Sequence, residues 1–170
     1  VWGFWAPIAS AAQPAHEHGV SDLNVALEGK SLIIELESPG ADIVGFEHAP
    51  KADRDKQAVR DAVATLRDGE TLFQPAAGAA CRLKDVDVRS ELMEHDPDRH
   101  EKHGHKNDRE AHAAFHVLYR FTCGFPEKLT HMVLTYFRAF PGARELDAQI
   151  ITTSGQSAQE LTAISSRLNF

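Results

Sequence analysis

Cysteine is scarce in this sequence, and the motifs of the common enzyme families are missing. The two cysteines, Cys81 and Cys123, form no C-x-x-C or other close pair, which argues against a cysteine-based metal site or redox motif. There is no H-E-x-x-H, G-x-S-x-G, P-loop or dinucleotide-binding glycine pattern. The sequence therefore indicates no catalytic machinery.

Basic residues and long apolar runs are also in short supply. The chain has 18 basic against 25 acidic residues, a net charge of −7. This balance argues against a nucleic-acid partner, whose phosphates require a basic patch, and suits a protein that attracts cations. No apolar run approaches the roughly 18 residues that a membrane span needs, so we expect none in the mature chain.

The first residues are apolar, from Val1 to Ile8, and small residues follow them. This pattern is typical of the end of a secretory signal. We expect residues 1–12 to be a signal-peptide remnant or a disordered tail, and residues 13–170 to form one domain. In an exported protein an even cysteine count predicts a Cys81–Cys123 disulfide; the alternative is two buried free thiols.

The hydrophobic pattern predicts an α+β fold, a single domain dominated by antiparallel β-sheet, with one or two helices and a histidine-rich loop. Alternation predicts a hairpin, and apolar residues three and four apart predict a helix. The expected elements are a hairpin over 20–38, a helix over 52–66, strands over 79–92, 115–123, 129–140 and 146–152, and a short closing helix or turn over 156–168.

A disulfide would also pair the two strands that carry the cysteines. Placing Cys81 opposite Cys123 centres a hairpin near residue 102 and brings Val88 close to His116. If the two strands pair without any irregularity, however, polar residues of the first strand lie on the same face as the apolar residues of the second. A β-bulge between the cysteines and the hairpin tip would bring the apolar residues of both strands onto one face.

Six of the ten histidines fall between residues 95 and 116, in polar surroundings. Neutral imidazole is the commonest metal ligand, and Zn²⁺ binds it readily. We therefore expect residues 95–112 to be a metal-capturing loop; the alternative is a solvated charged loop. The six are His95, His100, His103, His105, His112 and His116.

Pairs of histidines at short spacing are the best candidate ligands. His16 and His18 share a face of an extended chain about 7 Å apart, so both can reach one ion, and His103 and His105 have the same spacing. His112 and His116, four apart on a strand, are too distant to share an ion.

Single histidines elsewhere in the chain are weaker candidates. His131 is expected on a neighbouring strand, where it could partner His112 or His116. His48 follows Phe46 and Glu47 at the end of an element, a position open to a ligand. A lone histidine is more often structural, and for His48 and His131 we favour that interpretation slightly.

Seven stretches, in order along nearly the whole chain, resemble one known protein family. They are H-E-H-G-V-S-D-L-N-V-A-L-E-G (16–29), L-E-S-P-G-A-D-I-V-G-F-E-H-A-P (36–50), T-L-F (71–73), A-A-C-R-L (79–83), F-H-V-L-Y-R-F-T-C (115–123), F-R-A-F-P-G (137–142) and G-Q-S-A-Q-E-L-T (155–162). The family is ZrgA, zinc-regulated periplasmic proteins of Gram-negative bacteria. The resemblance implies an exported zinc-binding protein, made under zinc limitation, that assists zinc uptake through histidine ligands, many of them in a variable loop matching 95–112. This sequence departs from the family in having a short loop there.

We therefore expect a periplasmic protein, not an enzyme, that captures or buffers Zn²⁺ and hands it to a zinc uptake transporter or its periplasmic binding protein. The first-choice ligands are His16, His18, His103 and His105, followed by His100, His112, His116, His95 and His48. The rival hypothesis is a zinc-dependent hydrolase, which requires a preformed three-ligand site with an open water position and a nearby carboxylate base.

Overall fold

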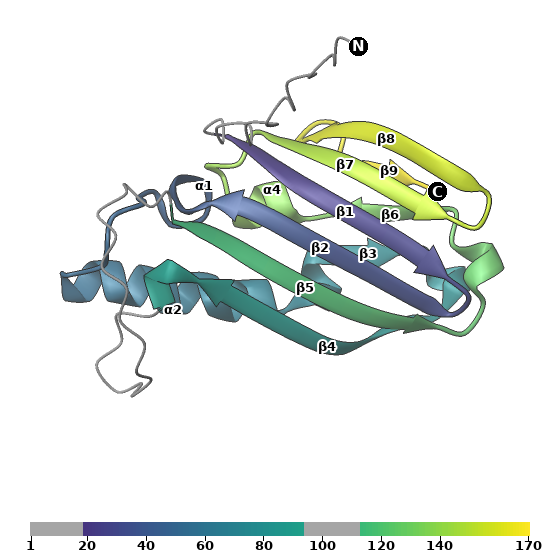
Figure 1. Ribbon diagram of the computed structural model, residues 1–170, viewed down its shortest axis with the longest axis horizontal. Coiled ribbons are helices and arrows are strands. Elements are labelled where there is room, and N and C mark those ends of the chain that lie inside the picture. Colours follow the sequence, from purple (N-terminus) through teal and green to yellow (C-terminus); the bar gives the residue numbers. More distant parts are fainter. Residues whose placement is uncertain (1–18, 94–112) are drawn as a thin grey trace, which may run out of the picture.

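A six-stranded sheet in the order β4-β5-β2-β1-β7-β8 forms one side of the molecule, and a three-stranded sheet, β3-β6-β9, lies behind it (Figure 1). The computed structural model describes residues 19–93 and 113–170. The large sheet comprises β1 (Val20–Glu28), β2 (Ser31–Pro39), β4 (Cys81–Ser90), β5 (Ala114–Cys123), β7 (Glu145–Thr152) and β8 (Gly155–Thr162); the small one comprises β3 (Phe73–Pro75), β6 (His131–Leu134) and β9 (Arg167–Asn169).

The described helices are α1 (Gly40–Val44), α2 (Asp53–Arg67), α3 (Gly69–Leu72) and α4 (Tyr136–Ala139), with 3₁₀ turns at Ala77–Ala79, Glu91–Met93 and Pro126–Lys128. The predicted helix corresponds to α2, which is 15 residues long and buries the apolar stripe of Val59, Ala62, Val63 and Leu66. It lies on the same side of the large sheet as the small sheet (Figure 1). The α+β class, dominated by antiparallel sheet, is confirmed.

The predicted first hairpin is also confirmed, because β1 and β2 pair antiparallel from Glu28–Ser31 outward. Alternate residues of these strands are buried, among them Leu23 and Ile34. Since successive side chains of a strand point to opposite faces, the residues in between form the outer face of the large sheet, which carries polar side chains such as Asn24 and Glu35 and some apolar ones such as Ile33.

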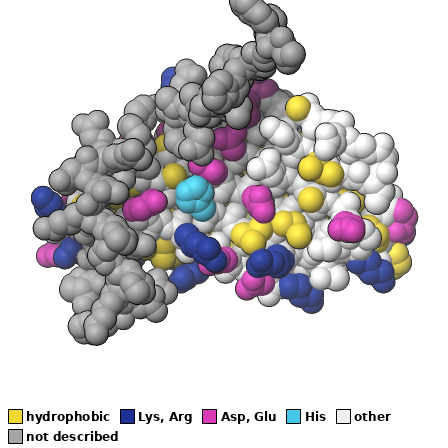
Figure 2. Space-filling model, in the orientation of Figure 1, with side chains coloured by type: hydrophobic (Ala, Val, Ile, Leu, Met, Phe, Trp, Pro, Cys, Tyr) yellow, Lys and Arg dark blue, Asp and Glu magenta, His cyan; other side chains and the backbone are white. Residues whose placement is uncertain are grey.

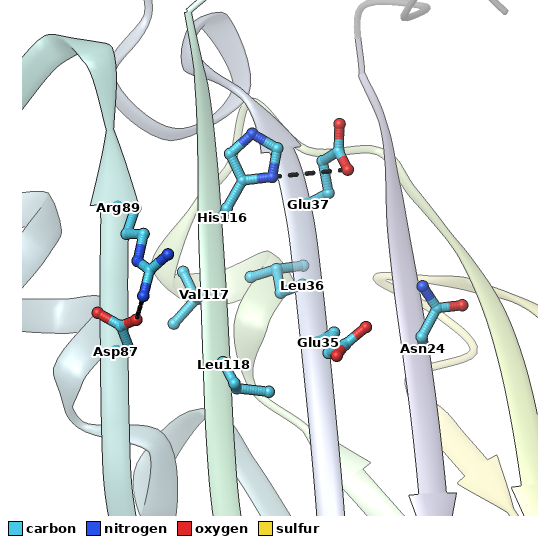
Figure 3. A pocket seen from close by; sticks show the side chains of 9 residues that line it. All are labelled: Asn24, Glu35, Leu36, Glu37, Asp87, Arg89, His116, Val117 and Leu118. Carbon is cyan, nitrogen blue, oxygen red and sulfur yellow. Dashed lines mark ion pairs between the residues drawn. The ribbon is translucent and has the colours of Figure 1, made fainter. Parts of the chain in front are cut away.

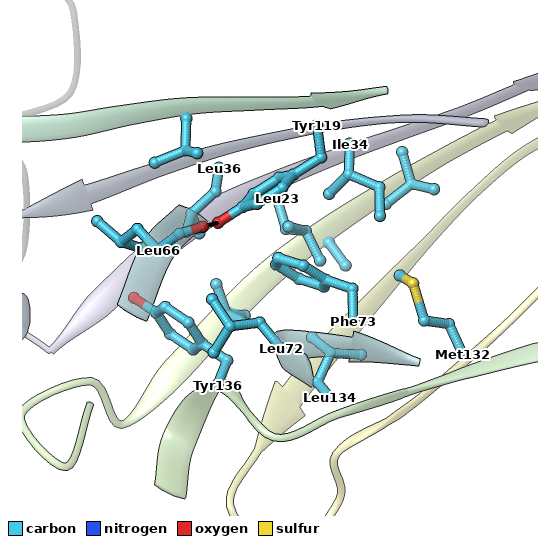
Figure 4. Close-up of a cluster of buried hydrophobic side chains, with 14 of the residues drawn as sticks. Leu23, Ile34, Leu36, Leu66, Leu72, Phe73, Tyr119, Met132, Leu134 and Tyr136 are labelled. Carbon is cyan, nitrogen blue, oxygen red and sulfur yellow. Dashed lines mark hydrogen bonds between the residues drawn. The ribbon is translucent and has the colours of Figure 1, made fainter. Parts of the chain in front are cut away.

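The core lies between the two sheets and α2, and two tyrosines provide its polar anchors (Figure 4). The Tyr119 hydroxyl donates a hydrogen bond to the carbonyl oxygen of Leu66 at 2.8 Å, which joins β5 to α2. The Tyr136 hydroxyl donates to Ser38 Oγ at 2.9 Å, and Ser21 donates to the same oxygen at 2.9 Å. Burial raises the pKa of Tyr136 to about 12, so it remains a neutral donor at physiological pH.

The pairing of β4 with β5 confirms both the disulfide and the bulge. Cys81 lies opposite Cys123 and is bonded to it, with an S–S distance of 2.03 Å. The register shifts between Leu83 and Asp85, which is the bulge that the apolar faces of the two strands require. The shift places Val88 opposite Val117 rather than His116, one residue from the position expected without the bulge.

The disulfide has a direct chemical test. We expect no free thiol when the denatured, unreduced protein is treated with an alkylating label and weighed by mass spectrometry, and two labels after reduction. Two labels before reduction would contradict the Cys81–Cys123 bond.

Two details of the predicted fold are wrong. The strand expected over 129–140 ends at Leu134, and residues Tyr136–Ala139 form the short helix α4. The closing helix or turn expected over 156–168 is instead β8, a turn and β9. A third feature was not predicted: β1 and β7 pair parallel, whereas the other pairs are antiparallel.

Within 19–93 and 113–170, the helices are all too short or too polar to cross a membrane. The expected signal remnant or tail at 1–12 and the histidine-rich loop at 95–112 lie outside the described residues. The strands that flank the second segment are adjacent and antiparallel, and Ser90 pairs with Phe115 close to where each strand meets it.

Candidate metal-binding corner

Two segments that contain histidines, residues 1–18 and 94–112, lie outside the described residues. Both join the fold at one end of the large sheet. The first joins at Gly19, directly before β1, and the second joins at Met93 and Ala113, between β4 and β5. In the sheet register, Asp22 of β1 lies opposite Glu37 of β2. Across β2, Pro39 lies opposite Ala114, so the starts of β1 and β5 are at the same end.

Residues of the short helix α1 form hydrogen bonds to Gly19 and Ala113, where the two segments join the fold. The backbone N–H of Gly19 donates to both carboxylate oxygens of Asp42, at 2.9 and 3.1 Å. The N–H of Gly40 donates to the carbonyl oxygen of Ala113 at 2.7 Å. Asp42 is 4% exposed, so this carboxylate stabilises the start of β1 from inside the fold. We call the region around α1 the α1 corner.

Gly19 is held on its other side as well. Its carbonyl oxygen accepts from the N–H groups of Arg144 and Glu145, both at 2.9 Å. Its φ of +90° is a backbone conformation that favours glycine, and the Arg144 guanidinium, 2.3 Å from where a Cβ would be, would have to move aside for any other residue. The residue that follows the His16–His18 pair is therefore fixed in place.

His48 also belongs to the α1 corner. The carbonyl oxygen of Phe46 lies 2.8 Å from the position of a Cβ added to Gly40, which places this loop against α1. The exposed ring of His48 stacks on the Phe46 ring with centroids 4.8 Å apart, and its Nδ1 lies 3.2 Å from the carbonyl oxygen of Ala49. These contacts orient the ring and leave Nε2 as the nitrogen available to a metal.

His116 is the candidate ligand whose surroundings are best defined. It lies on β5, on the outer face of the large sheet, and its side chain is 50% exposed. Its Nδ1 is 3.6 Å from Glu37 Oε2 on β2, and Figure 3 shows the ring directed at this carboxylate. A carboxylate beside an imidazole orients the ring and favours binding of a cation.

An open hollow of about 250 Å³ surrounds these two side chains (Figure 3). On the β4 side it is lined by Arg89, which lies opposite His116 and forms an ion pair with Asp87. On the other side are Glu35 and Asn24. Most of the lining residues are polar or charged and the hollow is open to solvent, which suits a hydrated cation better than an apolar ligand.

Carboxylates continue from His116 across the sheet in a single row. Glu37 lies opposite Asp22, Asp22 opposite Asp147, and Asp147 opposite Glu160. We call Glu37, Asp22, Asp147 and Glu160 the acidic row. Figure 2 shows a histidine on this face among acidic side chains. Like charges on neighbouring strands destabilise a sheet and concentrate negative potential, which attracts cations.

The remaining histidines divide into two groups. His16, His18, His95, His100, His103, His105 and His112 lie outside the described residues. His131 is described, but the expectation that it neighbours His116 is wrong. It is on β6 of the small sheet, opposite Asn169, whereas the neighbours of β5 are β4 and β2.

Among residues 19–93 and 113–170, no group of three or more His, Cys, Asp or Glu side chains is arranged to hold a metal ion. His116 with Glu37 therefore makes an incomplete site within this part of the chain. The sequence reading missed Glu37 as the neighbour of His116 and Asp42 as the anchor of Gly19. Both are non-local contacts, and only the strand register and the position of α1 reveal them.

Residues 15–170 match the family described as ZrgA family zinc uptake protein. A search of curated proteins finds no match to the chain. The match covers the whole described fold together with His16, His18 and the histidine-rich segment.

Proposed function

The chain belongs to the ZrgA family of zinc uptake proteins, and from this premise we propose that it captures or buffers Zn²⁺ in the periplasm and assists zinc uptake under zinc limitation. The observation that carries the proposal is the α1 corner. There, the attachment points of both histidine-bearing segments share one short helix, through Gly40 and Asp42.

We propose that the zinc ligands come from His16, His18, His103 and His105, then His100, His112, His116, His95 and His48. Borderline Zn²⁺ prefers imidazole, and several histidines joined to one corner can complete a site that the described residues leave incomplete. His116 and His48, both exposed, provide fixed partners for ligands from the two segments.

Periplasmic location and transfer of zinc to an uptake transporter, or to its binding protein, are further parts of the proposal. The Cys81–Cys123 disulfide supports an oxidising compartment. Exposed ligands on an open hollow favour exchange over permanent retention, which is what delivery to a second protein requires. The family description names uptake and no chemical reaction, which favours a binding protein over the hydrolase alternative.

The proposal predicts that replacing His116 weakens zinc binding whereas replacing His131 does not. In calorimetric titration of the metal-free protein with Zn²⁺, we expect His116→Ala to weaken the tightest binding event about tenfold or more, as loss of one ligand implies. His131→Ala removes the same side chain from β6 of the small sheet and serves as the matched control.

Two results would count against this function. Wild-type protein that takes up no Zn²⁺ in the micromolar range would remove its basis. Equal weakening by His116→Ala and His131→Ala would show that the outer face near Glu37 has no special role. Circular dichroism of both metal-free variants checks that neither substitution disturbs the fold.

A further inference from the structure

The two edges of the large sheet differ in how they are protected. At the β4 edge, the bulge between Leu83 and Asp85 interrupts the strand, and the Glu70 carboxylate accepts the N–H of Leu83 at 3.0 Å. Charged residues are dense along the same strand: Arg82, Lys84, Asp85, Asp87 and Arg89. Bulges, charges and side-chain caps are the features by which proteins prevent an edge strand from pairing with another chain.

The β8 edge has no bulge and few charges. The Asn169 N–H of β9 donates to Gln159 Oε1 at 2.8 Å, a contact that caps the backbone of β9 and not that of β8. The pairing of β8 with β7 is regular at every position from Gly155 to Thr162, and the one charged residue of β8 is Glu160. In the described part of the chain, no backbone group forms a hydrogen bond to the outer side of β8 between residues 156 and 161. A regular, nearly uncharged edge of this kind is a template for a further strand.

The hydrogen bonds at the end of β8 show which of its backbone groups point outward. Thr162 exchanges both backbone hydrogen bonds with Ser165, at 3.2 and 3.1 Å, and therefore points away from β7. In an antiparallel strand the N–H and C=O of one residue point to the same side, and the side alternates along the chain. Gln156, Ala158 and Glu160 therefore also point outward.

We propose that β8 pairs with β8 of a second copy of this chain, antiparallel, about a twofold axis at Ala158. In this register Ala158 lies opposite Ala158 of the second copy, and Gln156 lies opposite Glu160 of the second copy. Every outward N–H and C=O between residues 156 and 160 then gains a partner. The two large sheets become one continuous sheet, with their outer faces on the same side.

Hydrogen bonding and charge both select this register. A register centred on Gln159 would set Gln156 against Thr162, whose outward groups are already bonded to Ser165. A register centred on Glu160 would place two carboxylates directly opposite each other, which is destabilising. When the axis is at Ala158, Glu160 at the end of the acidic row lies opposite Gln156 of the second copy, which in turn lies opposite Ile151 of that copy. The acidic rows of the two copies therefore do not meet.

The test is self-association of the full-length, disulfide-bonded protein, measured by sedimentation velocity with a chelator present so that zinc bridges do not contribute. We expect a concentration-dependent monomer–dimer equilibrium. Ala158→Lys places two ammonium groups across the twofold axis and should weaken the dimer at least about tenfold. Gln149→Lys is the matched control, because Gln149 is the exposed β7 neighbour of Ala158 on the same face.

A mixture of Ala158→Lys with Ala158→Glu protein tests the register itself. Opposite charges at the axis should restore association that each variant alone has lost. A wild-type monomer up to high micromolar concentration overturns the proposal, and so does equal weakening by the Ala158→Lys and Gln149→Lys substitutions. Failure of the mixture to reassociate overturns the register centred on Ala158. Thermal unfolding of each variant confirms that the fold is intact.

Discussion

Deleting residues 95–110 should remove most of the zinc that the protein binds and leave the fold in place. The deletion takes away His95, His100, His103 and His105. It falls between β4 and β5, which are adjacent, antiparallel and joined by the Cys81–Cys123 bond. A shorter connection between such strands costs little, because loop-closure entropy changes slowly with length.

Equilibrium dialysis against buffered Zn²⁺, with the metal counted by atomic emission, measures the loss of capacity. The melting temperature of the metal-free deletion variant should stay within about 4 °C of wild type, since about 1 kcal/mol shifts a domain of this size by 2–4 °C. The matched control keeps the length and replaces the same four histidines by asparagine, and it should lose as much zinc as the deletion. Unfolding of the deletion variant would show that the segment contributes to the core.

The sequence predicts those parts of the fold that have a local periodic signal. The hairpin of β1 and β2 and the helix α2 follow from alternation and from apolar residues three and four apart. The bulge in β4 follows from a conflict between two patterns, because the cysteines fix one register and the apolar faces require another. Each of these predictions depends on residues within one or two neighbouring elements.

Elements whose local signal is misleading or absent were predicted wrongly or not predicted. Leu161, Ile164 and Leu168 have helical spacing, yet Leu161 is buried in β8, Leu168 is buried in β9, and Ile164 is 99% exposed in the turn between them. The strand β8 is at a sheet edge and largely solvent-exposed, so its polar sequence has no apolar alternation. The parallel pairing of β1 with β7 joins segments more than 100 residues apart, which no local pattern encodes.

The candidate site shows the same division. Residue type and spacing identify histidines as candidate ligands, because the chemistry of imidazole does not depend on the fold. Which histidines lie close enough to share a metal ion does depend on the fold. No pattern in the sequence distinguishes Asp42 from the other acidic residues, and only the fold shows that its buried carboxylate fixes Gly19 beside the attachment point of the other histidine segment.

Zinc affinity should fall steeply between pH 7.5 and pH 5.5. Histidine binds metal as the neutral imidazole, whose reference pKa is about 6.5, so the neutral fraction falls about tenfold over this range. Two or three histidine ligands in one site therefore imply a loss of about 100- to 1,000-fold. A site made mainly of carboxylates would lose far less, because those groups titrate near pH 4.

The measurement is a competition titration with a fluorescent zinc indicator, calibrated at each pH in a buffer that does not chelate the metal. Far-ultraviolet circular dichroism of the metal-free protein across the same range shows whether the fold persists, so that unfolding is not counted as loss of affinity. A substitution in the acidic row distinguishes histidine ligands from carboxylate ligands. Asp147 lies on β7, which β2 and β1 separate from His116 on β5. If histidines bind the metal, Asp147→Asn should change the zinc affinity little and leave its dependence on pH unchanged. An affinity independent of pH over this range would exclude histidine as the principal ligand, and with it the proposal that the histidines at the α1 corner capture zinc.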